Sequence, residues 1–351
     1  MVVNTLGSRA IRLDRNECPG PLPGVADVLR SDADGWHRYP SDSSVLAGML
    51  AAETHGNPDS VVLGAGSMEL LARLLQIACG GIGGEVIFAA PSPAAYSALA
   101  RQAGATSVRV PTTSDGVTDV EAMAEAAGPA TRVMIVCNPH NPTGSVLRRP
   151  QLHGLLDQVD PSVLVVIDEA YREFVYDPDV PDGAALARSR PNVITLRTFS
   201  TAYGLAGLRV GYAIAQPPVA TVLRHAGLAH QISAPAQIAA MASLPRKAEL
   251  AARTAFTAGE RERIRSALRD NGLDTPPSHG NFTWIPLRYS GEQFRQLCAE
   301  HGIIIAAYPG AGVRISVSSP AENIEFIELA AQARRVTRPD RRALRQDTVL
   351  T

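Results

Sequence analysis

Short apolar runs alternate with longer segments of helical periodicity over most of the chain. The runs are rich in Val, Ile and Leu, as expected of strands that are buried on both faces. They cover residues 61–63, 85–88, 132–137, 163–167 and 193–196. After the first run, Leu70, Leu71, Leu74 and Leu75 follow the spacing of one helix face. Strands that alternate with helices predict an α/β fold with a mostly parallel sheet, whose ligands bind at the carboxyl ends of the strands.

Polar turns follow three of these runs directly. The run 61–63 leads through a glycine turn to Ser67 and Met68 at a helix start, where backbone N–H groups favour a phosphate. The run 132–137 leads into Asn138-Pro-His-Asn-Pro-Thr-Gly144, a turn with two Asn-Pro pairs, which is rare by chance. The run 163–167 ends at Asp168, and a buried carboxylate at that point needs a partner.

The segment 193–212 is the most informative stretch. It reads as a buried strand, a polar turn, a group of small residues and a second apolar run. Small residues allow close approach of two backbones or of a ligand. A turn that brings the hydroxyl of Ser200 and the guanidinium of Arg209 together would suit a phosphate.

Composition narrows the functional class. A length of 351 residues and a hydrophobic content of 45% are typical of a two-domain enzyme with a large buried sheet. A net charge of −1 does not favour nucleic acid or an anionic membrane as a partner. Four scattered cysteines without a Cys-x-x-Cys pair predict neither a zinc site nor a disulfide framework, so we expect no metal. Without a secretory signal or a long apolar run, the expected location is cytoplasmic.

The segment 193–212 resembles the lysine segment of the fold-type I pyridoxal-phosphate enzymes, and in particular the histidinol-phosphate aminotransferase branch of the class I/II aminotransferases. The usual form there is Ser-Lys-Ala-(Phe/Tyr)-Gly-Leu-Ala-Gly-Leu-Arg-x-Gly, and the threonine-phosphate decarboxylases of cobalamin synthesis look similar. One position differs, because Thr201 stands where the family has its Schiff-base lysine. Other family-like motifs run in family order from about residue 13 to 317.

The resemblance implies a fold and a division into domains. The expected fold is a large domain with a mostly parallel seven-stranded sheet flanked by helices, plus a smaller α+β domain. We expect an N-terminal arm at residues 1–31, the large cofactor domain at 32–245 and the small C-terminal domain at 246–335, with part of the arm. A mobile basic tail is expected at 336–351.

The resemblance also implies pyridoxal 5′-phosphate or pyridoxamine 5′-phosphate as cofactor. At its phosphate we expect the residues of the glycine turn and of the central segment: Ser67, Met68, Ser200 and Arg209. Tyr96, in a motif similar to the family's Pro-Thr-Phe-x-x-Tyr, is expected to stack on the ring.

Three further residues are expected at the ring's polar atoms. Asn141 and Tyr171 are assigned to the ring hydroxyl oxygen. Asp168 is assigned to the protonated ring nitrogen, where a carboxylate keeps the ring an electron sink.

Two more groups follow from family-like motifs. Tyr39, in Arg38-Tyr39-Pro40, is expected to reach the cofactor phosphate of the neighbouring subunit, which requires a homodimer. The substrate, an amino acid or a keto acid, is expected to meet Asn16, Asn281 and Arg314, the last gripping the α-carboxylate. Ala306 occupies the position at which the histidinol-phosphate branch usually has an arginine for the substrate phosphate. An apolar or neutral amino acid is therefore expected.

Thr201 leaves three interpretations open. Threonine has no amine to form the covalent link, and its hydroxyl is a poor base, so ordinary transamination is in doubt. Lys247, the only lysine, lies in a charged stretch and is expected on the surface. The chain is a lysine-independent member with non-covalently held cofactor, a catalytically silent homologue that binds cofactor or a partner, or a deliberate lysine-to-threonine variant of an amino-acid transaminase.

Overall fold

The computed structural model describes residues 10–40, 42–287 and 290–332, which form two compact units. The large unit comprises Glu17–Asn141 and Ser145–Ala255. The small unit comprises, among the described residues, 10–16, 142–144, 256–287 and 290–332. The predicted basic tail, 336–351, lies outside the described residues, as do residues 1–9 of the predicted arm.

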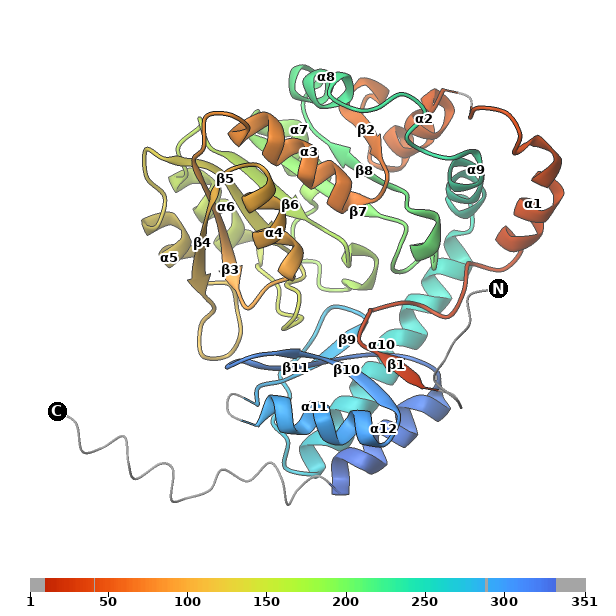
Figure 1. Cartoon of the computed structure of the whole chain (residues 1–351), viewed down its shortest axis with the longest axis vertical. Helices are drawn as coiled ribbons and strands as arrows, with labels where there is room; N and C mark the ends of the chain where they lie inside the picture. Colours follow the sequence, from red (N-terminus) through yellow and green to blue (C-terminus); the bar gives the residue numbers. More distant parts are fainter. Residues whose placement is uncertain (1–9, 41, 288–289, 333–351) are drawn as a thin grey trace. The chain divides into compact units, whose positions relative to one another are not determined.

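The large unit is built on a seven-stranded sheet with the order β2-β8-β7-β6-β5-β3-β4 (Figure 1). β8 is antiparallel to β2 and β7, and every other neighbouring pair is parallel. The strands are β2 (Val61–Gly64), β3 (Glu85–Ala90), β4 (Thr106–Pro111), β5 (Thr131–Cys137), β6 (Leu164–Asp168), β7 (Val193–Thr198) and β8 (Gly211–Ile214). The predicted α/β fold with a mostly parallel sheet is confirmed.

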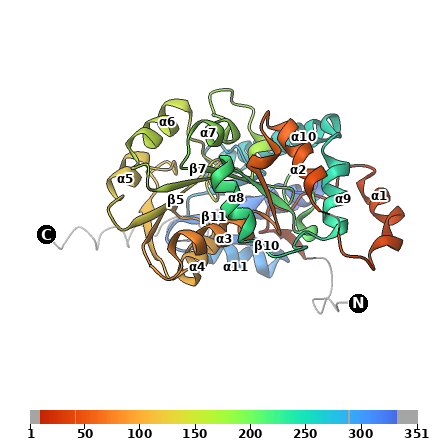
Figure 2. The ribbon, with the colours of Figure 1, turned by 90° about the horizontal axis from the view of Figure 1, so that it is seen from above.

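Helices cover both faces of this sheet (Figures 1 and 2). Successive strand residues point to opposite faces, so Ile87 and Phe88 belong to two separate apolar cores. One face is covered by α3 (Ser67–Cys79), α4 (Ala94–Gln102) and α8 (Pro217–His225). The other is covered by α2 (Ser44–Glu53), α5 (Val120–Glu125), α6 (Arg149–Gln158), α7 (Gly183–Ser189) and α9 (Ala234–Ser243), with α1 (Val25–Ser31) beside α9. Short 3₁₀ turns occur at Ala33–Gly35, Pro58–Ser60, Arg172–Phe174 and Ala206–Leu208.

The small unit has a four-stranded sheet with the order β1-β10-β11-β9. Its strands are β1 (Ile11–Leu13), β9 (Phe282–Ile285), β10 (Ile303–Tyr308) and β11 (Gly312–Ser316). β1 is parallel to β10, and the other pairs are antiparallel. Its core is shared with α11 (Gly291–Glu300), α12 (Pro320–Gln332) and the later part of α10 (Lys247–Asp270), which begins in the large unit. This α+β arrangement agrees with the prediction.

Two classes of feature are missing from the part of the chain that the structure describes. No described helix has the length and apolar character needed to span a bilayer. No described group of three or more His, Cys, Asp or Glu side chains is placed to hold a metal ion. The four cysteines are not joined in disulfides.

A partly buried ionic cluster lies near the carboxyl ends of β6 and β7. Arg197 of β7 donates from Nε to Oε2 of Glu169 at 2.8 Å and also pairs with Asp182, which caps α7. The cluster thereby ties the end of β6 and the start of α7 to β7. Glu173 interacts electrostatically with Arg197. Its Oε2 atom is buried and has no hydrogen-bond partner.

Burial raises the pKa of Glu173 from its ordinary 4.5 to about 7. Between these two values the folded protein keeps a proton that the unfolded chain loses, so stability falls as pH rises through this window. The Glu173→Gln variant lacks that penalty. We expect it to exceed the wild type in unfolding free energy by about 1–3 kcal/mol at pH 8, and to lose this advantage near pH 4.5.

Urea denaturation of both proteins at a series of pH values measures the difference. Glu325→Gln, which changes an exposed carboxyl on α12, is the control and should show no comparable trend. A Glu173→Gln advantage independent of pH would contradict the assignment.

Candidate cofactor site

The carboxyl ends of three parallel neighbours, β5, β6 and β7, carry the central polar residues of the site. Cys137 ends β5 and pairs in register with Asp168, which ends β6, and Asp168 pairs with Leu196 of β7. The turns after these strands contain Asn141, Tyr171 and Thr201, respectively. Sequence positions far apart are therefore brought to one edge of the sheet, where α/β proteins bind ligands.

Asp168 is the charged centre of this edge. Its side chain is 3% exposed. Oδ2 accepts a hydrogen bond from the Tyr96 hydroxyl at 2.7 Å, and Oδ1 accepts one from the Ala170 N–H at 3.1 Å. Burial raises the pKa of Asp168, and these two donors oppose the rise. A cation placed against the carboxylate would be strongly favoured in such a setting.

Asn141 and Tyr171 form a pair beside this carboxylate in the fold. Asn141 Nδ2 donates to the Tyr171 hydroxyl oxygen at 2.9 Å, and both side chains are buried. The pairing brings together the two residues that were assigned to one oxygen of the cofactor ring. Neighbouring amide and phenol groups can bind a single oxygen atom between them.

A second cluster forms at the start of α3. Gly66 precedes the helix with φ of 92°, and no side chain caps the first turn. A Cβ on Gly66 would lie 2.4 Å from Nη2 of Arg209, so the guanidinium lies directly against the helix N-terminus. Ser67 is the first helical residue. Uncapped N–H groups, the helix dipole and a guanidinium at one point suit a phosphate.

Ser200 is linked to the start of α3 through Thr198 and Gly211. Its hydroxyl lies 2.8 Å from the hydroxyl of Thr198, and Thr198 pairs with Gly211 of β8. A Cβ on Gly211 would lie 2.7 Å from the backbone nitrogen of Ser67. Met68 is half-buried and packs on the apolar core of its sheet face.

Thr201 is buried next to the Asp168–Tyr171 turn. Its hydroxyl donates to the carbonyl oxygen of Ala170 at 2.7 Å. Lys247 carries the chain's only lysine amine, which pairs with Glu53 at 2.7 Å, and its side chain is 68% exposed. Position 201 thus presents a hydroxyl group, which is bonded to the turn after β6.

Tyr39 takes no part in these clusters within its own chain. It is 84% exposed and stacks on His230, with ring centroids 4.8 Å apart.

The hydroxyl of Tyr96 donates to Asp168, and its ring lies edge-to-face with that of Phe88, with centroids 5.7 Å apart. The stacking role assigned to Tyr96 stays a prediction, and the hydroxyl contact is a feature that sequence reasoning missed.

The small unit brings together its three predicted residues. Asn281 Nδ2 donates to the backbone oxygen of Asn16 at 2.9 Å, and the Ser316 hydroxyl donates to Asn16 Oδ1 at 2.8 Å. Arg314 donates to the Tyr308 hydroxyl at 3.2 Å and lies over the ring of Phe282. Ser316 was missed, although it lies two residues beyond Arg314 on β11 and the two-residue period of a strand could have found it.

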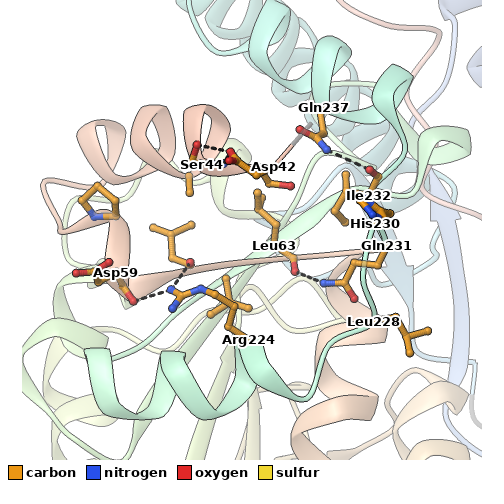
Figure 3. A pocket seen from close by; sticks show the side chains of 15 residues that line it. Asp42, Ser44, Asp59, Leu63, Arg224, Leu228, His230, Gln231, Ile232 and Gln237 are labelled. Atoms are coloured by element: carbon orange, nitrogen blue, oxygen red, sulfur yellow. Dashed lines mark hydrogen bonds between the residues drawn. The ribbon is translucent and has the colours of Figure 1, made fainter. Parts of the chain in front are cut away.

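A separate cavity of about 600 Å³ lies in the large unit (Figure 3). Ser44 donates to Asp42 on one side, and on the other Gln231 donates to the backbone oxygen of Leu63. Arg224 donates to the carbonyl of Asp59 across its floor. None of the residues predicted for the cofactor or the substrate lines this cavity.

Comparison with known proteins identifies the family. The model of the family "Aminotransferase class I and II" matches residues 8–329. This chain belongs to the class I and II aminotransferases. It is 44% identical over 333 residues to a Streptomyces avermitilis protein named aromatic amino acid aminotransferase, covering 94% of this chain and 92% of the relative. A Thermobifida fusca protein of the same name is 44% identical over 324 residues, which is 92% of this chain and 90% of the relative.

Solved aminotransferase structures share the fold. Histidinol-phosphate aminotransferase from Sinorhizobium meliloti, in complex with pyridoxal 5′-phosphate, matches 95% of this chain and 91% of its own with a TM-score of 0.84 and 29% identity. A Thermus thermophilus aspartate aminotransferase mutant matches 93% and 96% with a TM-score of 0.81 and 22% identity. The fold-type I assignment is therefore confirmed, and the family is one of pyridoxal-phosphate-dependent transferases.

The residues present fit two parts of this family's cofactor, the ring nitrogen and the phosphate. The buried carboxylate of Asp168 suits a protonated ring nitrogen, and the guanidinium against the uncapped start of α3 suits a phosphate. The chain's one lysine amine, that of Lys247, is exposed and pairs with Glu53.

Close backbone packing supports the turn that carries Thr201. Gly204 has φ of 70°, and a Cβ there would lie 1.8 Å from the backbone oxygen of Gly20. Arg253 reinforces the contact by donating to the oxygens of Gly20 and Ala202. We expect Gly204→Ala to cost about 2–4 kcal/mol of unfolding free energy, from left-handed strain plus overlap.

The matched control is Gly207→Ala in the same segment. A Cβ at Gly207 would meet nothing within 4 Å. Its unfolding free energy in a denaturant titration should stay within about 0.5 kcal/mol of the wild type. Equal losses in the two variants would contradict the packing described here.

Proposed function

We propose that this chain binds pyridoxal 5′-phosphate or pyridoxamine 5′-phosphate without a covalent link, together with an α-amino or α-keto acid, and that its chemistry does not use a lysine. The observation that carries the proposal is the contact of Thr201 with Ala170, which fills the predicted lysine position with a hydroxyl. The cofactor, when bound, supplies an electron sink for bonds at the substrate's α-carbon.

Each protein group has an assigned task in this proposal. Asp168 holds a proton on the ring nitrogen, and Asn141 and Tyr171 bind the ring oxygen. Ser200 and Arg209 hold the phosphate, with the backbone of Ser67 and Met68. Two observations support these assignments: the buried carboxylate of Asp168, which accepts a bond from Tyr96, and the hydrogen bond between Asn141 and Tyr171.

We propose an aromatic amino acid or its keto acid as the substrate. Curated relatives at 44% identity bear the name aromatic amino acid aminotransferase. In the small unit Arg314, assigned to the α-carboxylate, lies beside the aromatic side chains of Phe282 and Tyr308. Ala306, directly across from Arg314 in the β10–β11 register, offers no charge to a substrate phosphate.

We also propose a cytoplasmic homodimer in which Tyr39 serves the neighbouring subunit. Tyr39, Trp36 and Leu228 are 84%, 50% and 82% exposed, and large apolar groups gathered on a surface favour association. Tyr39 and Trp36 line one hollow with Pro235. None of the four cysteines is joined in a disulfide, which is in keeping with a reducing compartment.

A catalytically silent, cofactor-binding role is the second candidate. It is favoured by the hydrogen bond of the Thr201 hydroxyl to Ala170, which occupies the only side-chain group at that position. Loss of a positioned proton-transfer group typically costs about 10²–10⁴-fold in rate. An arginine is no substitute for the lysine as a base, because a guanidinium in a protein stays protonated.

Cofactor binding should be saturable and reversible. We expect one equivalent of pyridoxal phosphate to bind per chain in a spectroscopic titration and to be removed by gel filtration. After borohydride reduction, peptide mapping should find no modified side chain except Lys247. Lys247→Arg should bind with an affinity within about twofold of the wild type, because Lys247 is an exposed surface residue. A wild-type chain that binds no cofactor would refute the proposal.

Restoring the amine should restore covalent attachment. We expect Thr201→Lys to keep the cofactor through gel filtration and to gain conversion of aromatic amino acids by about 10²-fold or more over the wild type. Thr201→Met, which adds length but no amine, is the control and should gain neither property. Single-turnover absorbance with tyrosine or phenylalanine measures the gain. Covalent attachment without conversion would favour the silent homologue.

A further inference from the structure

The carboxylate of Asp168 is held by one donor at each oxygen. Ala170 belongs to the turn that follows β6, so its N–H is fixed by the local backbone. Tyr96 comes from α4 and donates to Oδ2 from 72 residues away in the sequence. An ionised carboxylate accepts about four hydrogen bonds, so both oxygens retain capacity for a further donor.

The hydroxyl of Tyr96 can act only as a donor toward this carboxylate. Burial, and next the negative charge of Asp168, raise the pKa of Tyr96 well above its ordinary value, so the phenol keeps its proton. The ring is 1% exposed and its orientation is fixed by the edge-to-face contact with Phe88. Turning the hydroxyl away would leave the buried Oδ2 of Asp168 without this hydrogen bond, which is costly.

We propose that Tyr96 is a positioning residue that acts on the cofactor through Asp168. Its hydroxyl keeps the carboxylate ionised and oriented, so that the proton shared with the ring nitrogen stays on the nitrogen. This inference rests on the cofactor binding proposed above. It concerns the hydroxyl of Tyr96 and is separate from the predicted stacking of its ring.

The physical reason is the low polarity around the pair. A buried carboxylate that has lost a donor becomes a stronger base. Without the Tyr96 hydroxyl, Asp168 would take the proton from the ring nitrogen, and an ion pair would become a neutral acid bonded to a neutral ring. One proton moves between two atoms, and no other reactant is needed. The neutral ring is the weaker electron sink.

The test uses pyridoxamine 5′-phosphate with ¹⁵N in its ring and the full-length chain at pH 7. For Tyr96→Phe we expect binding roughly 10- to 100-fold weaker, as for the loss of a hydrogen bond to a charged group. The ring ¹⁵N resonance of the bound cofactor should move toward the position of the unprotonated ring. The resonance is read only from bound, folded protein, so a general loss of stability does not shift it.

Tyr212→Phe is the matched control, because Tyr212 is a buried tyrosine on β8 that belongs to the opposite face of the sheet. It should bind within about twofold of the wild type and leave the resonance unmoved. In an Asp168→Asn background, Tyr96→Phe should change the affinity by less than about twofold, because the group through which it acts is gone.

The outcomes separate the two proposals. A Tyr96→Phe variant with wild-type affinity and a wild-type ¹⁵N resonance would overturn the role of Tyr96 while leaving cofactor binding intact. Additive effects of Tyr96→Phe and Asp168→Asn would also overturn it. Failure of the wild-type chain itself to bind pyridoxamine phosphate would refute the proposed function, and this inference with it.

Discussion

The burial of a carboxylate at the end of β6 is the constraint on which the rest of the candidate site depends. Asp168 is almost fully removed from water, and an isolated charge in that position would be strongly unfavourable. Two hydrogen-bond donors stabilise this carboxylate, one from the adjoining turn and one from α4. Two neutral donors do not cancel a full negative charge, so the site is electrostatically suited to a cation, and a protonated heterocycle meets that need.

The candidate site contains two groups of polar contacts. The guanidinium of Arg209 lies against the start of α3, and the Asn141–Tyr171 pair forms in the turns that follow β5 and β6. None of these contacts requires an amine at position 201. The hydroxyl of Thr201 donates to the carbonyl oxygen of Ala170, and the chain's one lysine amine, that of Lys247, is exposed. The polar contacts described for the site therefore do not depend on the side chain of Thr201.

Sequence patterns predicted the fold because the residue types in each strand reflect which of its faces are buried. The run 132–137 is apolar throughout since both faces of β5 are covered by helices, and helical spacing after residue 67 marked α3. Residues at strand ends were found for the same reason, since Asp168 directly follows a buried run. Side-chain direction was harder to predict. Tyr96 on α4 and Asp168 at the end of β6 are separated in the sequence by β4, α5, β5 and α6, and nothing local to either residue specifies their contact. In the small unit, the bond between Asn281 and the backbone of Asn16 likewise depends on distant chain segments meeting.

The scarcity of lysine gives the molecule one chemically distinct surface point. The ε-amine of Lys247 is exposed on the first turn of α10, the helix that continues from the large unit into the small one. An amine-reactive dye, used at a pH above the pKa of an α-amino group, would label the start of that helix and the α-amino group alone. After blocking of the terminus, a fluorophore at Lys247 would form one partner of an energy-transfer pair, so that the spacing of the two units could be followed as ligands bind.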